Sequence, residues 1–109
     1  MKTILLDECV PKKFQFSLIP HLCVSVREAG FAGKKNGELL ALAEGRFDVF
    51  LTVDKSLRYQ QNMKDRQIAV LIIRAHGNSL AILKPHAAAC LLALESIQLG
   101  EVVEVGLAA

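Results

Sequence analysis

The sequence predicts a three-layer α/β domain built on a mainly parallel sheet of about five strands. Short apolar runs recur along the chain and alternate with segments of helical pattern. Several of these runs are apolar at every position, which is typical of strands covered on both faces of a parallel sheet. No linker, repeat or low-complexity stretch interrupts this order, and 109 residues are an ordinary length for one domain. We therefore expect a single domain over residues 1–109.

The expected strands are short and follow the apolar runs. They cover residues 3–6, 21–26, 48–53, 68–73 and 102–105. The run at residues 3–6 is fully apolar, as expected of a central parallel strand, and the run at residues 68–73 is apolar on both faces. We place the last strand at an edge, with Glu101 and Glu104 exposed.

Helical patterns fill the segments between these strands. They cover residues 11–20, 38–44, 56–62 and 85–99. Pro11 suits the first turn of its helix, and Pro20 ends it. Asn36 is a plausible N-cap of the second helix, which we expect to bury Leu42 among other leucines. The last helix is expected to pack through residues that include Leu92.

Composition limits the functions to be considered. The hydrophobic content is 52% and the mean hydropathy is +0.35, which are high values that suggest a homodimer or a protein partner. A net charge of +2 argues against a general polybasic nucleic-acid binder. The three cysteines lack metal-site spacing and the N-terminus is unlike a signal peptide, which favours the cytoplasm. No apolar run is long enough to cross a membrane.

Carboxylates occur where parallel strands end. Asp7 and Glu8 directly follow the first strand, Asp54 follows the third, and Glu38 opens the second helix. Each acid alone could serve as a helix-terminal or turn residue. Acids at the carboxyl ends of neighbouring parallel strands, however, fall where α/β folds bind ligands. Because such acids repel one another unless a cation neutralises them, the pattern indicates a site for a hard metal ion.

Basic residues lie next to the acids along the chain. They are Lys12, Lys55, Arg58 and Arg74. Most lysines and arginines are ordinary solvated charges, but acids surrounded by bases suit a metal-bound phosphodiester with its flanking phosphates. We therefore expect these four side chains to contact substrate phosphates.

Four segments in order resemble the small PIN-like domain family, which includes VapC-type toxins encoded beside an antitoxin. The segments are LLDECVP, NGELLALAEG, FLTVDKSL and AVLIIRAHGNSLAILKP. The resemblance implies a Mg²⁺- or Mn²⁺-dependent ribonuclease, with RNA as substrate and an antitoxin protein as partner. It implies that Asp7, Glu38 and Asp54 bind the metal and activate water. Glu8 would contact these ligands without binding the metal itself.

The chain departs from the family pattern at three positions. Cys9 stands where asparagine is usual, Asn36 stands where an aspartate often precedes the helix, and Ser56 replaces a second aspartate after the third strand. The last departure removes a metal ligand or base, so a catalytically inactive PIN-like binding module is one alternative.

A receiver-like phosphoacceptor domain is the other alternative. Such a domain also has an acid pair after its first strand, an aspartate after its third, and a Lys-Pro pair like Lys84-Pro85. The segment between Asp54 and Lys84 is too short for the strand, helix and strand expected there, and a further strand follows the last helix. These features favour the ribonuclease.

Overall fold

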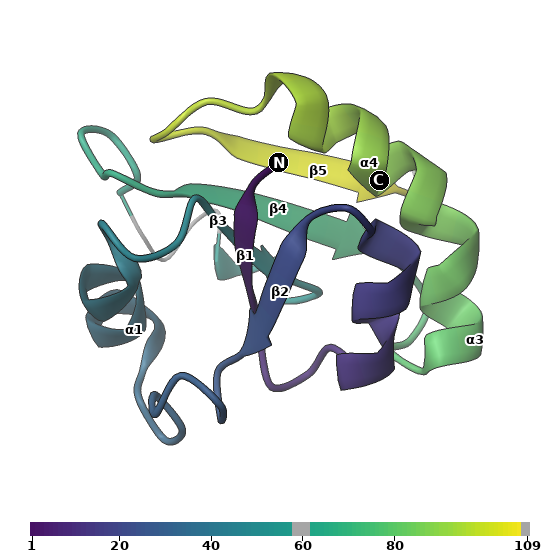
Figure 1. Ribbon diagram of the computed structural model, residues 1–109, viewed down its shortest axis with the longest axis horizontal. Coiled ribbons are helices and arrows are strands. Elements are labelled where there is room, and N and C mark those ends of the chain that lie inside the picture. Colours follow the sequence, from purple (N-terminus) through teal and green to yellow (C-terminus); the bar gives the residue numbers. More distant parts are fainter. Residues whose placement is uncertain (58–61, 108–109) are drawn as a thin grey trace.

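A computed structural model describes residues 1–57 and 62–107 and shows an α/β fold (Figure 1). Its five-stranded sheet is parallel throughout, in the order β2-β1-β3-β4-β5. The strands are β1 (Thr3–Leu6), β2 (Leu22–Ser25), β3 (Val49–Thr52), β4 (Ala69–Arg74) and β5 (Val102–Gly106). The predicted three-layer fold class is confirmed, and all five predicted strands are present with β5 at an edge.

Helical segments cover both faces of the sheet. They are η1 (Lys12–Leu18), α1 (Asn36–Ala43), α3 (Leu80–Leu83), η2 (Lys84–His86) and α4 (Ala87–Ser96). The first is a 3₁₀ helix. The last predicted helix begins five residues early, and its Lys84–His86 turn, which contains Pro85, is 3₁₀ because proline lacks the N–H of a regular turn. The helix predicted over 56–62 lies mostly outside the described residues.

Three details of the helix predictions were wrong. Asn36 is the first residue of α1 rather than its N-cap; Lys35 occupies that position without a side-chain cap. Leu42 is 42% exposed and Leu92 is 69% exposed. In α4 and in the part of α1 from Leu39 onward nearly every position is apolar, so the sequence does not reveal which side faces the sheet.

Two apolar cores lie on opposite faces of the sheet. One contains residues from η1, α3 and α4, such as Phe14, Leu83 and Leu94, against Leu6 and Leu71 of the sheet. The other packs α1 against alternate strand residues. Figure 1 shows α1 on one side of the strands and α3 with α4 on the other. The central strands are therefore covered twice, which explains why they are apolar at successive positions.

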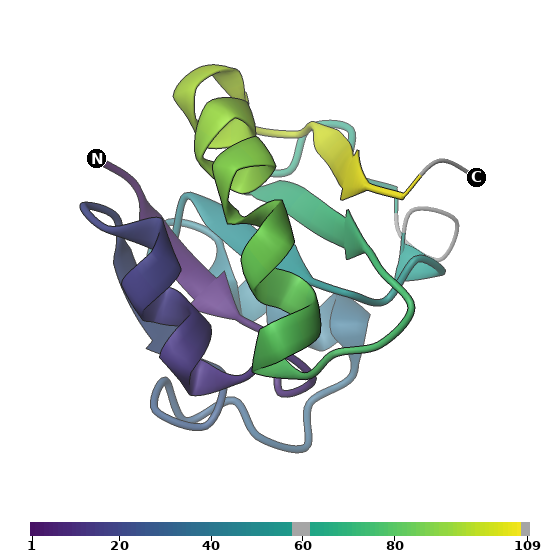
Figure 2. The same cartoon turned by 90° about the vertical axis from the view of Figure 1, so that its right-hand side faces the viewer.

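The last crossover has an unusual hand. The β1–β2 and β4–β5 connections lie on the same face, as Figure 2 shows, yet they step in opposite directions across the sheet. Their hands must therefore be opposite. The β1–β2 crossover is right-handed and the β4–β5 crossover is left-handed. Crossovers between parallel strands are right-handed in about 98% of cases, so β4–β5 is an exception.

The chain leaves β1 and β3 in opposite directions across the sheet. From β1 it continues to the edge strand β2, and from β3 it continues to β4. The carboxyl ends of β1 and β3 thus form the switch point at which parallel α/β sheets bind ligands. In the described part of the chain, no helix has the length and apolar character required to cross a membrane.

Candidate functional site at the carboxyl edge of the sheet

Asp7 and Asp54 follow adjacent strands at the switch point. β1 and β3 pair through Leu6 and Leu51, and the backbone N–H of Asp7 continues this pairing by donating to the Leu51 carbonyl at 2.9 Å. Asp7 is thus fixed by the sheet, and both aspartates are half-buried. The predicted placement of these two acids on neighbouring strand ends is what the structure shows.

Thr52 joins the two strand ends. Its hydroxyl donates to Oδ2 of Asp7 at 2.7 Å and accepts the backbone N–H of Asp54 at 3.0 Å. Among the described residues it is the one fully buried polar side chain. Thr52 was not predicted to belong to the site, although a hydroxyl at the end of an apolar strand is a signal, because a buried polar group requires a partner.

Cys9 lies against the same carboxylate. Its thiol donates to Oδ2 of Asp7 at 3.4 Å and lies 3.7 Å from the Thr52 hydroxyl. Burial, together with the negative charge of Asp7, raises the pKa of the Cys9 thiol. The side-chain amide of Asn78 donates to the Cys9 carbonyl at 2.9 Å and fastens this loop to the one after β4. Cys9 is therefore a neutral neighbour of Asp7.

Ser56 orients Asp54 by closing a turn. Oδ1 of Asp54 accepts the Ser56 backbone N–H at 3.0 Å and its hydroxyl at 2.6 Å. No described residue donates a hydrogen bond to Oδ2 of Asp54. The serine that stands in place of a second aspartate thus fixes one carboxylate oxygen and leaves the other available.

Glu8 and Glu38 are held away from this pair. Oε1 of Glu8 accepts the Gly33 N–H at 3.4 Å. Glu38 pairs with Lys34 at 3.5 Å, one helical turn earlier, and its side chain is 59% exposed. Over residues 1–57 and 62–107, no three histidine, cysteine, aspartate or glutamate side chains form a group that could hold a metal. The structure therefore places Asp7 and Asp54 on adjacent strand ends, and Glu38 is not grouped with them.

A basic cavity lies on the β4 side of the acids. It has a volume of about 230 Å³ and is lined by Lys55, Arg74, Ala75, His76 and Leu107. Arg74 donates to Glu104 at 2.8 Å, and the glutamate side chain is only 16% exposed. The prediction that Glu104 is exposed was therefore wrong, because Arg74 draws it against the sheet. Lys55 and Arg74 do share one cavity, and the sequence analysis missed His76; Arg58 lies outside the described residues.

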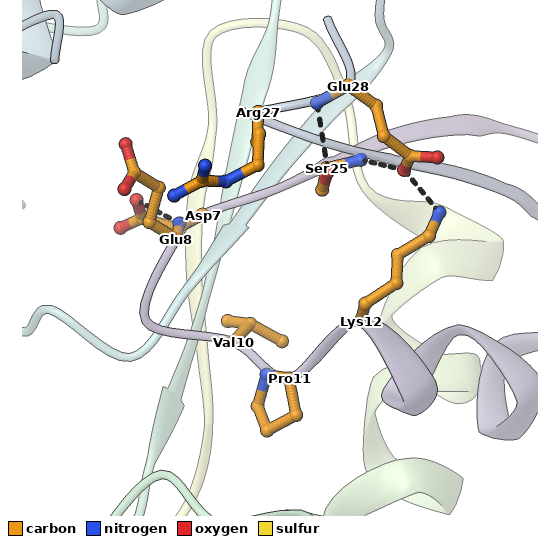
Figure 3. A pocket seen from close by; sticks show the side chains of 8 residues that line it. All are labelled: Asp7, Glu8, Val10, Pro11, Lys12, Ser25, Arg27 and Glu28. Carbon is orange, nitrogen blue, oxygen red and sulfur yellow. Dashed lines mark hydrogen bonds and ion pairs between the residues drawn. The ribbon is translucent and has the colours of Figure 1, made fainter. Parts of the chain in front are cut away.

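A larger cavity lies on the β2 side of the acids. Its volume is about 400 Å³, and Figure 3 shows the eight residues around it. They are Asp7, Glu8, Val10, Pro11, Lys12, Ser25, Arg27 and Glu28. Lys12 does not point freely into it, because its ammonium forms an ion pair with Glu28. The acids therefore lie between two cavities, each with basic side chains in its lining.

The oxygen donors of this site suit a hard divalent cation. Asp7 and Asp54 supply carboxylates, and Mg²⁺ needs only one or two of these because it keeps several waters. The bonds from Thr52 and Ser56 fix one oxygen of each carboxylate, as is usual for groups that support metal ligands. Compared with known proteins, the chain matches no family model, no curated sequence and no solved structure, so the geometry of the site carries the functional argument.

Proposed function

We propose that this protein is a cytoplasmic, Mg²⁺- or Mn²⁺-dependent ribonuclease of PIN-like type, acting as the toxin of a toxin–antitoxin pair. The observation that supports it most is the Thr52 hydroxyl, which binds Oδ2 of Asp7 and the N–H of Asp54 at the switch point. Its two bonds satisfy this buried hydroxyl and hold the two acid-bearing strand ends in a fixed arrangement. Hydrolysis of a phosphodiester is a task that uses such acids.

In this mechanism Asp7 and Asp54 would hold the metal ion, which neutralises phosphate charge and lowers the pKa of a bound water. Thr52 holds Asp7 in one orientation, and Ser56 does the same for Asp54. Lys55 and Arg74, which line the cavity on the β4 side, contact the RNA phosphates that flank the cleaved phosphodiester. Glu38 is 59% exposed and pairs with Lys34, so in this arrangement it would not bind the metal ion directly.

The test compares two aspartates at opposite ends of the sheet. Asp7→Asn should abolish cleavage of single-stranded RNA in Mn²⁺. Asp48→Asn is the matched control, because Asp48 also accepts a backbone N–H, from Thr3 at 2.8 Å, but precedes β3 rather than following a strand. The control should cleave like the unmodified protein. RNA cleavage that survives Asp7→Asn would reject the proposal.

A receiver-like phosphoacceptor is the second candidate, and the strand order favours it. The order 2-1-3-4-5 is that of the flavodoxin-like folds, to which receivers belong. Two features disfavour it: the left-handed β4–β5 crossover, and the position of Lys84, which precedes α4 on that same connection. Transfer of phosphate from acetyl phosphate to Asp54, detected by intact mass, would establish this candidate. Failure of both metal and acetyl phosphate assays would leave the inactive binding module.

The antitoxin and a second copy of the chain are the proposed protein partners. Large apolar side chains are exposed at the end of η1 and the start of β2: Phe16 at 65%, Ile19 at 66% and Leu22 at 56%. Apolar side chains clustered in sequence on a surface often mark an interface. Light scattering of the purified chain, alone and with the product of the adjacent gene, tests both partners.

A further inference from the structure

The cavity on the β2 side has a wall that the proposed chemistry does not use. Asp7 lines one side of it and belongs to the acidic pair. Across the cavity from Asp7, Figure 3 shows Lys12 and Glu28 on the far side, with Val10 and Pro11 below. A volume of about 400 Å³ lies within the range of small-molecule sites. The cavity therefore has room for a chemical group next to whatever is bound at Asp7.

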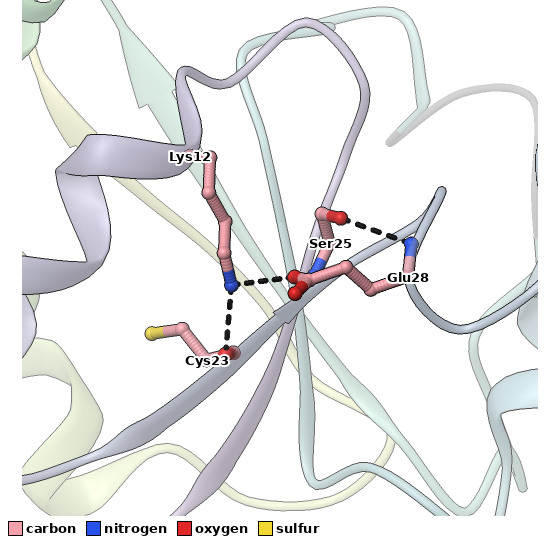
Figure 4. Close-up of polar contacts among 4 residues, drawn as sticks. All are labelled: Lys12, Cys23, Ser25 and Glu28. Atoms are coloured by element: carbon pink, nitrogen blue, oxygen red, sulfur yellow. Dashed lines mark hydrogen bonds and ion pairs between the residues drawn. The ribbon is translucent and has the colours of Figure 1, made fainter.

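The far wall is polar, and its side chains are joined by hydrogen bonds. Oε1 of Glu28 accepts the Ser25 N–H at 3.0 Å, and the Glu28 N–H returns a bond to the Ser25 hydroxyl at 3.1 Å. The Lys12 ammonium pairs with Glu28 and also donates to the Cys23 carbonyl at 3.4 Å, as Figure 4 shows. These bonds fix an anionic acceptor beside a cationic donor. Such a pair is complementary to the polar edge of a nucleobase, where donors and acceptors alternate.

The remaining walls suit the flat faces of a base. Val10 is 5% exposed and Pro11 is half-buried, so both present a packed apolar surface rather than mobile side chains. Arg27 is exposed and, in Figure 3, its guanidinium lies on the same side of the cavity as Asp7 and Glu8. Guanidinium planes stack on bases and also bind phosphate. The cavity is thus lined by apolar groups, by a guanidinium that can stack on a base, and by polar groups that can bind the edge of a base.

We propose that this cavity binds the nucleobase next to the cleaved phosphodiester, with Lys12 and Glu28 contacting its polar edge. The identification of the neighbouring group as the cleaved phosphate rests on the proposed function. The cavity then selects where the strand is cut, because Glu28 accepts hydrogen bonds but cannot donate them. Bases that present amino or imino N–H groups toward Glu28, guanine above all, are favoured.

Binding is tested without metal and without cleavage. The four ribonucleoside 5′-monophosphates are titrated into ¹⁵N-labelled protein, with inorganic phosphate as the reference anion. Guanosine monophosphate should shift the amides of Ser25 and Glu28, whereas inorganic phosphate should not. Equal shifts with inorganic phosphate, or no shift of these amides with any nucleotide, would overturn the proposal.

Glu28→Gln and Glu44→Gln form a matched pair of variants. Glu44 also accepts a backbone N–H, from Gln67 at 2.7 Å, and pairs with a cation, Arg66, at 3.2 Å, but it lines none of the cavities described above. Glu28→Gln should weaken guanosine monophosphate binding roughly tenfold, the usual scale for a hydrogen bond to a charged group. Glu44→Gln should leave it unchanged. The same loss in both variants would refute the role of Glu28.

Arg27→Gln is a second variant, since Arg27 is exposed and its loss should not disturb folding. It should weaken binding of all four nucleotides to a similar extent, because stacking does not distinguish bases. Unchanged binding in both Arg27→Gln and Glu28→Gln would reject the cavity as a base site. A protein that binds nucleotides here but cleaves no RNA would refute the proposed function alone. One that cleaves RNA at the same positions after Glu28→Gln would refute the inference alone.

Discussion

Replacing Thr52 with valine tests the link between the two acidic strand ends. Valine has nearly the same shape, but it removes a hydroxyl that is fully buried. The change deletes the 2.7 Å bond to the Asp7 carboxylate and leaves the Asp54 N–H without its 3.0 Å acceptor. Thr52→Val should therefore destabilise the domain even though it adds apolar volume.

The expected loss can be worked from these two bonds. A hydrogen bond to a charged group contributes about 1.5–3 kcal/mol and a neutral one about 1 kcal/mol. Burying a methyl group in place of the hydroxyl returns up to about 0.8 kcal/mol. The net loss is about 2–3 kcal/mol. At about 2.1 cal/mol/K of unfolding entropy per residue, a 109-residue domain should melt about 10 °C lower.

Thr52→Ser is the control, because it keeps the hydroxyl and loses only a methyl group, at a cost of about 1 kcal/mol. Both variants are measured by urea and thermal unfolding monitored by circular dichroism. If Thr52→Val is as stable as Thr52→Ser, the hydroxyl does not join the strand ends and the reasoning fails. If the bonds are present, combining Thr52→Val with Asp7→Asn should cost less than the sum of the single changes.

Three further predictions concern metal binding, pH and backbone geometry. Mn²⁺ at a hundred times its dissociation constant should stabilise the protein by about 2.7 kcal/mol, which raises Tm by about 10 °C. The Asp54→Asn variant, which keeps the bonds from Ser56, should show no such rise. A Tm of the unmodified protein that does not change with Mn²⁺ would argue against the metal site. The Lys12 ammonium, followed by the Ser25 N–H, lowers the pKa of Glu28 to about 2, so its stabilising effect is complete above the ordinary glutamate pKa of about 4.3 and is lost as the pH falls toward 2. Urea midpoints of the unmodified protein and Glu28→Gln should therefore converge over that interval, and a constant difference would contradict the assignment. Gly106 has φ +105°, and an added Cβ would lie 2.4 Å from the Arg74 carbonyl oxygen, whereas one at Gly30 (φ +83°) would meet nothing within 4 Å. Gly106→Ala should therefore lose about 1–3 kcal/mol more unfolding free energy than Gly30→Ala, measured by urea unfolding. Equal losses would show that the backbones of β5 and β4 are not in close contact at Gly106.

The fold class and the strand ends could be predicted because apolar period and strand direction are local properties. Runs that are apolar at successive positions require cover on both faces, and acids that follow parallel strands must share an edge. Asp7 and Asp54 were found in this way. Their adjacency also needed β1 next to β3, a strand order that was not predicted from the sequence.

The parts that could not be predicted depend on tertiary choices between similar local options. Glu38 could equally turn toward the acids or pair with Lys34, which precedes its helix, and the i, i+4 pair is the arrangement found. Leu92 lies on a helix whose residues are almost all apolar, so periodicity could not select its buried side. The left-handed crossover has no local signature at all. Thr52 could have been found, because one polar residue in an apolar run needs a partner.

The left-handed crossover also divides the domain unequally. It places α3, η2 and α4 on the face that already carries η1, and the opposite face carries the eight-residue α1 and the irregular segment at residues 26–35. We expect native-state hydrogen exchange to divide along the same line, with α1 amides exchanging before those of β1, β3 and β4. Asp7 and Asp54 belong to the slow half, whereas Arg27 and the Glu8–Gly33 contact belong to the fast half. The acids therefore lie in the part of the domain that we expect to open last.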